Sequence, residues 1–212
     1  MTNYFITIAG NIGVGKSTLT ALLAERLDWE PVYEAVTENP YLADFYEDMQ
    51  RWSFQSQVFF LSRRLQQHHD LLQRERPVIQ DRSVYEDAEV FACNLYRQGH
   101  LSERDWQCYM DLYRTLATLL QPPHLVVYLQ ASAATLRRRI GQRGRGYEQT
   151  ISDAYLGQLN QLYDAWASNF RLCPVLTVNT DNLNYVQHEA HLDQLWERIE
   201  DRLQGREFLA LE

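Results

Sequence analysis

The 212-residue sequence predicts an α/β fold in which a five-stranded parallel sheet lies between layers of helices. Two observations predict it. A glycine-rich turn joins the first apolar run to the first helical pattern, and short runs rich in Val, Ile, Leu and Tyr then alternate with long helical patterns. The runs indicate strands over residues 4–9, 31–36, 77–81, 124–130 and 174–179. Because ligands of such sheets bind at the carboxyl ends of the strands, we expect the functional residues there.

The composition is that of an ordinary globular protein, with 45% hydrophobic and 23% charged residues, and we expect a single domain over residues 1–212. No run of 18 apolar residues and no secretion signal is present, so we expect no membrane association and a cytoplasmic location. Cys93, Cys108 and Cys173 are odd in number and far apart, which favours reduced thiols. The net charge of −8 argues against nucleic acid as a partner.

The turn after the first strand fits the pattern G-x-x-x-x-G-K-[ST] at every fixed position, and a helix is expected over residues 18–27. Glycines allow consecutive backbone N–H groups to approach phosphate oxygens, and the helix N-terminus adds a partial positive charge. The pattern therefore predicts a phosphate-binding loop (P-loop), although an ordinary glycine-rich turn is the alternative. The residues expected to bind ATP are Gly10, Asn11, Ile12, Gly13, Val14, Gly15, Lys16, Ser17 and Thr18. Lys16 would bridge the β- and γ-phosphates, and Ser17 would bind Mg²⁺.

Lys16 is the only lysine among the 20 basic residues, and the other 19 are arginines. A planar guanidinium would not fit inside a loop wrapped around phosphate, whereas a compact ammonium does. The single lysine is therefore interpreted as a requirement of the chemistry at this site.

Glu34 stands at the end of the second predicted strand, beside the P-loop. A carboxylate at this place can accept the proton of a hydroxyl group that attacks the γ-phosphate. Glu34 is therefore a candidate catalytic base, and a solvated glutamate at a strand exit is the alternative.

A long helix is expected over residues 51–73, with Gln57 and Arg64 beside its apolar stripe. Seven residues are close to two helical turns, so both side chains should point the same way, about 10 Å apart. An amide and a guanidinium could bind the polar edge of a heterocycle. They could equally be polar residues that border a core.

The third predicted strand ends at Asp81-Arg82-Ser83 and runs directly into a helix. Ser83 and Glu86 fit a capping box, and Asp87 in the first turn could simply complement the helix dipole. Asp81 could hold the water shell of a metal ion, and Arg82 could contact the transferred phosphoryl group.

A helix over residues 136–142 leads into a glycine-flanked segment that is rich in arginine. We expect residues 139–149 to form a lid in which Arg139, Arg143 and Arg145 bind the phosphates of ATP and exclude water. A solvated basic helix is the alternative.

Together these pieces resemble the deoxynucleoside kinase family of P-loop enzymes, over nearly the whole chain. The family has a P-loop, a glutamate ending the second strand, a tyrosine and a tryptophan six residues apart, a glutamine-bearing helix, a D/E-R-S sequence and an R-x-x-x-R-x-R-x-x-E lid. The matching residues here are Gly10 to Ser17, Glu34, Tyr46, Trp52, Gln57, Asp81, Arg82, Ser83, Arg139, Arg143, Arg145 and Glu148. Residues 80–87 look most like bacterial deoxyadenosine kinases, whereas Ala35 departs from the proline of many animal members.

The resemblance implies a phosphotransferase of nucleotide salvage that uses ATP with Mg²⁺, held by Ser17 and Asp81, to phosphorylate the 5′-hydroxyl of a deoxynucleoside. Lys16, Glu34 and Arg82 would be catalytic. The residues implied to bind the deoxynucleoside are Glu34, Tyr46, Gln57, Arg64, Arg82, Asp87 and Glu148. We expect deoxyadenosine to be preferred, with deoxyguanosine or deoxycytidine second, because the amide and the Arg64–Asp87 pair offer donors and acceptors to an amino-bearing ring. Relatives form homodimers through long helices, for which residues 51–73 are a candidate.

Two other functions share parts of this pattern. A nucleoside monophosphate kinase of the thymidylate kinase type has a P-loop and an arginine lid, but its acceptor is already an anion and needs no carboxylate base. A GTP-hydrolysing switch recognises guanine through an N-K-x-D motif. With Lys16 as the only lysine, that motif cannot occur.

Overall fold

The computed structural model describes residues 3–34, 38–71, 73–148 and 151–205. Its centre is a sheet of five parallel strands in the order β2-β3-β1-β4-β5, which confirms the predicted sheet. The strands are β1 (Phe5–Gly10), β2 (Glu30–Val32), β3 (Val78–Asp81), β4 (Leu125–Gln130) and β5 (Val175–Asn179).

The second strand is shorter than the predicted range of 31–36. It lies at the edge of the sheet, where it pairs only with β3, and it ends at Val32. Tyr33 and Glu34 follow it outside the ladder, and residues 35 and 36, including the noted Ala35, lie outside the described residues. The ladder between β2 and β3 ends at Val32 and Gln80, one residue before β3 itself ends.

The predicted helices over 18–27, 51–73 and 136–142 correspond to α1, α3 and α7. The helical segments are α1 (Lys16–Leu27), α2 (Leu42–Glu47), α3 (Met49–Leu71), α4 (Val84–Glu86), the π-helical η2 (Asp87–Ala92), α5 (Cys93–Arg97), α6 (Glu103–Ala117), α7 (Ala133–Arg143), the 3₁₀ segment η3 (Gly146–Glu148), α8 (Asp153–Asn169) and α9 (Glu189–Leu203). Within the described ranges, none of these helices has the length and apolar character needed to span a bilayer.

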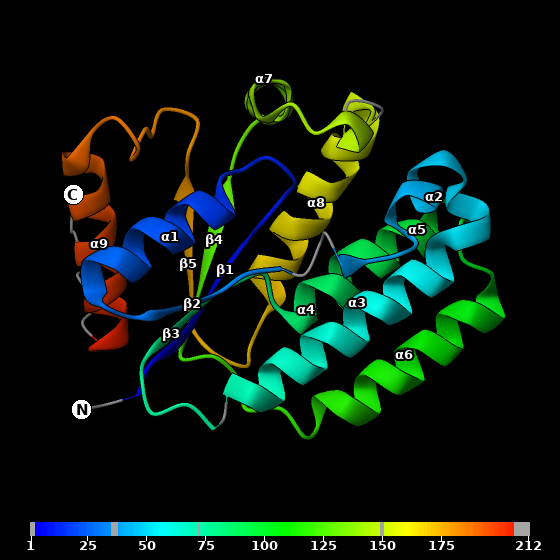
Figure 1. The fold of residues 1–212 in the computed structure, drawn as a ribbon, viewed down its shortest axis with the longest axis horizontal. Coiled ribbons are helices and arrows are strands. Elements are labelled where there is room, and N and C mark those ends of the chain that lie inside the picture. Colours follow the sequence, from blue (N-terminus) through cyan, green and yellow to red (C-terminus); the bar gives the residue numbers. More distant parts are fainter. Residues whose placement is uncertain (1–2, 35–37, 72, 149–150, 206–212) are drawn as a thin grey trace.

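Helices cover the sheet in two layers. Figure 1 shows α1 and α9 on one side of the sheet and α8, α4 and α3 on the other. The helix α6 packs against α3 and forms the outer surface of that layer. The loops at the carboxyl ends of β1, β2 and β3 therefore open between α1 and the α3–α8 layer.

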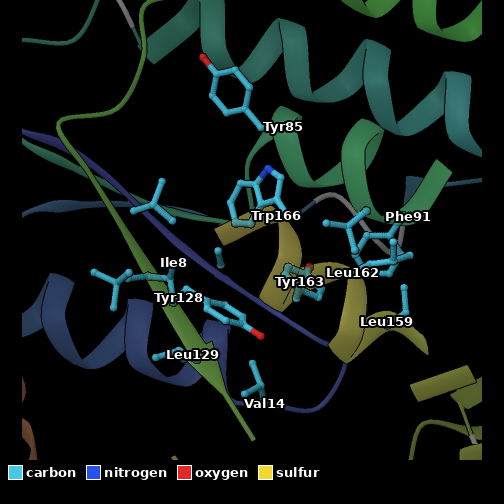
Figure 2. Packing of buried hydrophobic residues seen from close by; sticks show 14 of the residues in the cluster. Ile8, Val14, Tyr85, Phe91, Tyr128, Leu129, Leu159, Leu162, Tyr163 and Trp166 are labelled. Atoms are coloured by element: carbon cyan, nitrogen blue, oxygen red, sulfur yellow. The ribbon is translucent and has the colours of Figure 1, made fainter. Parts of the chain in front are cut away.

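The core joins the sheet to α8, the helix behind the P-loop. Tyr128 of β4 stacks on Tyr163 of α8 with ring centroids 5.7 Å apart, and Trp166 and Phe91 meet Tyr163 edge-on (Figure 2). Burying each large side chain of this kind contributes roughly 1.5–3 kcal/mol. The aromatic cluster thereby fixes α8 at a constant distance from β4 and from the loop that follows β1.

Candidate active site

The predicted P-loop connects β1 to α1, and its glycines adopt conformations that other residues avoid. Gly10 has φ 142° and Gly15 has φ 106°. A Cβ atom on Gly10 would lie 2.5 Å from the carbonyl oxygen of Leu129, and one on Gly15 would lie 2.5 Å from the hydroxyl of Tyr185. The first turn of α1 carries no acidic side chain. Its free N–H groups therefore present an uncompensated positive end to an anion.

Lys16 folds back over this loop. Its Nζ donates to the carbonyl oxygens of Gly10 at 3.0 Å and Asn11 at 3.1 Å, and the residue is only 7% exposed. Burial first, and then the positive charge of Arg82, lower the pKa of Lys16 to about 8, although Asp81 and Glu34 oppose the shift. A triphosphate in the loop would supply the negative charge that this buried ammonium lacks.

Neighbouring elements hold the P-loop from several sides. The amide of Asn11 donates to the carbonyl of Leu156 at 2.9 Å and to Asn160 Oδ1 at 2.8 Å, both on α8. The hydroxyl of Tyr185 donates to the carbonyl of Gly15 at 3.2 Å. These bonds fix the loop before any ligand binds, which reduces the conformational entropy lost on binding.

Arg139 bonds mainly to backbone carbonyl groups, whereas the lid motif predicts that it binds the phosphates of ATP. Its guanidinium donates to the carbonyl oxygens of Val14 at 2.9 Å and Thr180 at 2.7 Å, and to the Thr180 hydroxyl at 3.0 Å. It therefore joins α7 to the P-loop and to the segment after β5. It still borders the cavity beside the P-loop, with most of its donors already used.

Ser17 and Asp81 meet at the end of β3, as the metal-site prediction requires. The Ser17 hydroxyl donates to Asp81 Oδ2, whereas the buried Oδ1 of Asp81 has no hydrogen-bond partner within the described part of the chain. A hydroxyl beside an unsatisfied carboxylate oxygen fits Mg²⁺, which uses one or two protein ligands and completes its shell with phosphate and water oxygens. No group of three or more His, Cys, Asp or Glu side chains gathers as a metal site in the described residues.

Glu34 lies between two arginines. Its Oε1 is 3.3 Å from Arg82 Nε and 3.4 Å from Arg64 Nη2, and its side chain is 14% exposed. Burial raises the pKa of Glu34, but Arg82, Arg64 and Lys16 together outweigh burial and hold it below its ordinary value. Glu34 is therefore an ionised carboxylate at neutral pH, and it faces the same cavity as Lys16.

Arg82 has an unusual backbone. Its φ is 66°, a left-handed conformation that costs a non-glycine residue roughly 1–2 kcal/mol. The guanidinium lies 4.1 Å above the ring of Phe91, and its buried Nε has no hydrogen bond within the described ranges although Glu34 is close. The turn thus directs Arg82 into the cavity with hydrogen-bonding capacity to spare.

Arg64 stands behind the cavity wall. Its Nε donates to Asp87 Oδ2 at 3.1 Å and its Nη1 to the Asp81 carbonyl at 3.1 Å. Gln57 and Asp87 line the cavity, whereas Arg64 is not among the residues that line it. Burial raises the pKa of Asp87 and Arg64 opposes that rise. Arg64 thereby orients the Asp87 carboxylate rather than bordering the cavity itself.

The cavity has a volume of about 280 Å³ and brings together most of the predicted acceptor residues. It is lined by Ile12, Gly13, Lys16, Ser17, Tyr33, Glu34, Leu42, Phe45, Tyr46, Gln57, Phe60, Asp81, Arg82, Asp87, Phe91, Arg143, Arg145, Glu148 and Tyr155. The aromatic side chains that line it, apart from Tyr46, were not predicted from the sequence. Helical spacing could have found some of them, because Phe60 follows Gln57 by three residues and Phe91 follows Asp87 by four.

A second cavity of about 710 Å³ lies on the other side of Lys16, between the P-loop, α7 and residues 181–187. Thr18 borders this one, and Arg143 and Arg145 border both cavities. Arg143 Nε also donates to Glu148 Oε2 at 3.0 Å. The lid arginines therefore stand at the boundary between the two spaces. Residues 181–187 were missed because their sequence carries no phosphate- or base-binding pattern.

Glu86 has more partners than its predicted capping box. The capping box with Ser83 is present, and the carboxylate also accepts from the Gly10 backbone N–H at 3.2 Å and the Tyr163 hydroxyl at 2.8 Å. The side chain connects the start of the P-loop to α4 and α8.

Comparisons with known proteins agree with this geometry. A family model described as "Deoxynucleoside kinase" matches residues 6–204. The deoxyadenosine/deoxycytidine kinase of Bacillus subtilis is 36% identical over 199 residues, covering 93% of this chain and 92% of the relative. The deoxyguanosine kinase of the same organism is 32% identical over 205 residues, covering 93% and 96%. A solved structure of deoxyadenosine kinase from M. mycoides with bound dATP superimposes with a TM-score of 0.82 at 28% identity, covering 92% of this chain and 99% of that one.

Proposed function

The chain belongs to the deoxynucleoside kinase family, and we propose deoxyadenosine as its preferred acceptor. It is an ATP-dependent kinase that transfers the γ-phosphoryl group to the 5′-hydroxyl of a deoxynucleoside. The space between Glu34 and Gln57 suits the nucleoside, and the space beside α7 suits ATP.

The observation that carries the mechanism is that Glu34, which follows β2, and Lys16, which begins α1, border the same cavity. Glu34 accepts the proton of the 5′-hydroxyl as its oxygen attacks phosphorus. Arg82, beside Glu34, contacts the phosphoryl group in transfer, and Lys16 bridges the β- and γ-phosphates. Mg²⁺, held by Ser17 and Asp81, would neutralise charge on the phosphates. A carboxylate at this place repels a phosphorylated acceptor, which disfavours a monophosphate kinase.

The lining of the acceptor cavity supports the choice of base. Gln57 and Asp87 offer an amide and a carboxylate, and Phe60, Phe91 and Tyr155 supply an apolar wall for a flat ring. Such a combination suits an amino-bearing base, because the carboxylate can accept from an exocyclic amino group. Tyr46 and Glu148 also border this cavity, where they would bind the sugar 3′-hydroxyl.

Substrate competition tests this assignment. The purified enzyme is given ATP and Mg²⁺ with each of the four deoxynucleosides, and ADP production is followed. We expect the highest kcat/KM with deoxyadenosine, then deoxyguanosine or deoxycytidine. Feeding dAMP in parallel separates a nucleoside kinase from a monophosphate kinase. A preference for thymidine contradicts the base assignment, and a preference for dAMP contradicts the acceptor class.

The variant Glu34→Gln tests the base. It keeps the size of the side chain and removes the proton acceptor, so we expect kcat to fall on the order of 10²-fold or more. The dissociation constant for deoxyadenosine, measured by calorimetry without ATP, should change far less. An unchanged kcat removes Glu34 from the mechanism.

We further propose a homodimer built on the α3–α6 layer and a cytoplasmic location. The outermost helix, α6, exposes Leu112 at 41%, and Leu119 just beyond its end is 73% exposed. Exposed apolar side chains gathered on one face are a feature of association surfaces, and these two leucines lie on and just after the same helix. Cys93, Cys108 and Cys173 are free thiols, as expected in a reducing compartment.

A further inference from the structure

Glu86 is a fully buried carboxylate beside the active site, and the proposed mechanism does not use it. Its side chain is 0% exposed at the end of α4. A helix cap on the protein surface would satisfy Ser83 without burying a charge. The additional partners of Glu86 therefore need an explanation of their own.

The first partner is the Gly10 N–H, whose bond to Glu86 takes the place of a backbone hydrogen bond between β1 and β3. The register between β1 and β3 ends at Ile8 and Asp81, and the Arg82 N–H still donates to the Ile8 carbonyl at 3.0 Å. The next N–H of β1 on this side belongs to Gly10, and in a parallel ladder it would bond to the Arg82 carbonyl. The backbone turns away at Arg82, where φ is 66°, and the Gly10 N–H donates to Glu86 Oε2 instead.

The second partner fixes that turn. The Ser83 N–H donates to Glu86 Oε1 at 2.9 Å, and this bond holds the peptide that directly follows Arg82. A left-handed conformation at a residue with a Cβ persists only where its surroundings impose it. The third partner, the Tyr163 hydroxyl at 2.8 Å, ties the carboxylate to α8.

We propose that Glu86 is a positioning residue that fixes the first glycine of the P-loop relative to Arg82. One carboxylate holds the backbone on both sides of the reacting phosphate: Gly10 begins the loop that binds it, and Arg82 contacts it from the acceptor side. This proposal rests on the proposed function through the role of Arg82, whereas the link between Gly10 and Glu86 is independent of the substrate.

The burial of Glu86 affects the stability of the fold, and this effect distinguishes a positioning role from a purely structural one. Burial raises the pKa of Glu86, while Arg82 and Lys16 oppose the rise. A carboxyl group with a raised folded pKa favours folding while protonated, and that contribution is lost as pH rises from the ordinary carboxyl pKa through the raised value. At a pH above that raised value the ionised Glu86 therefore costs folding free energy, so a neutral replacement need not lower stability.

The test compares Glu86→Gln with Tyr163→Phe. In either orientation of its amide, the glutamine turns an NH₂ group toward the N–H of Gly10 or of Ser83, so one of the two backbone bonds on either side of the phosphate is lost. We expect kcat/KM for ATP to fall about tenfold or more, as for the loss of a charge-assisted hydrogen bond. The dissociation constant for deoxyadenosine and the midpoint of thermal unfolding should stay close to the wild-type values. Tyr163→Phe removes a donor from the same carboxylate away from the P-loop, and kcat/KM should change less than about threefold.

Two outcomes overturn the proposal: wild-type kcat/KM in Glu86→Gln, or equal losses in both variants. If Glu86→Gln does not fold, a measurement on the wild-type enzyme decides. With ¹⁵N-glycine and ¹³C-labelled glutamate, the Gly10 amide proton should shift with pH at the same midpoint as the Glu86 carboxyl carbon. A Gly10 signal that does not change at this midpoint refutes the link between Gly10 and Glu86. Because this readout needs no turnover, an enzyme that fails to phosphorylate any deoxynucleoside refutes the proposed function without affecting this test.

Discussion

Lys16 combines a positive charge with a buried position. Its ammonium is buried against two backbone carbonyls, and without nucleotide its pKa falls to about 8, chiefly because burial removes water from the charge. A bound triphosphate brings negative charge to the same place and favours the protonated form. Nucleotide binding and protonation of Lys16 should therefore be linked.

This linkage can be measured by calorimetry. At pH 8 about half of the Lys16 side chains are protonated in the free enzyme, and ATP should draw the rest to the protonated form. We expect an uptake of up to about half a proton per ATP, seen as a dependence of the binding enthalpy on the ionisation enthalpy of the buffer. The uptake should shrink at pH 6.5, where Lys16 is already protonated. In Lys16→Met it should vanish, and an unchanged uptake in that variant contradicts the assignment.

At the level of residues, the sequence predicted which side chains gather but not all of their partners. Asp81 ends β3, and Glu34 and Arg82 lie just after strand ends, so their convergence at one edge of a parallel sheet was predictable. Arg139 bonds to carbonyls of Val14 and Thr180, which lie 125 and 41 residues away in sequence. No local pattern reveals such a pairing, because every residue carries a carbonyl group.

Among the elements, α7 offers a matched pair of neighbours for a test. Arg139 joins this helix to the P-loop and to Thr180, whereas Arg138 is exposed. Arg139→Ala leaves the Val14 and Thr180 carbonyls without their charged donor, so we expect a loss of about 1–3 kcal/mol in unfolding free energy and a higher KM for ATP. Arg138→Ala should stay within about 0.5 kcal/mol of wild type in urea unfolding. Equal losses in both variants would show that Arg139 has no special structural role.

The helix after β3 was predicted in position but not in form. Its second part, Asp87–Ala92, is π-helical, and Asp87 and Phe91 from this segment both border the acceptor cavity. Hydrophobic periodicity cannot detect one additional residue in a turn, and π-helical segments are rare enough that a regular helix is the default expectation. By contrast, β1 and β4 were predictable, because buried parallel strands are continuously apolar.

On the scale of the whole molecule, the two cavities meet at Arg143 and Arg145, whereas no residue of α6 lines either of them. The acceptor cavity and the nucleotide cavity share Arg143 and Arg145. The outer side of α6 lies on the far side of α3 from the sheet (Figure 1). An interface on α6 would therefore leave both substrate openings free.

The proposed dimer can be tested by disrupting that layer. Leu112→Glu places a charge on the exposed side of α6 and should shift the sedimentation coefficient from dimer to monomer. Leu172→Glu is a suitable control, because Leu172 is 55% exposed but lies after α8 rather than on α6. A monomeric wild-type enzyme, or a Leu112→Glu enzyme that remains dimeric, places the interface elsewhere or excludes it.

The solitary lysine also gives this enzyme a built-in reporter. An amine-selective acylating reagent finds one side-chain target in the chain, and the depressed pKa of that amine keeps part of it in the nucleophilic, uncharged form. We expect ATP to shield Lys16 from modification, so the labelled fraction of the single peptide that contains it, read by mass spectrometry, should count vacant nucleotide sites directly. The 19 arginine side chains do not react with such a reagent. The fraction of enzyme with nucleotide bound could therefore be measured without an added label.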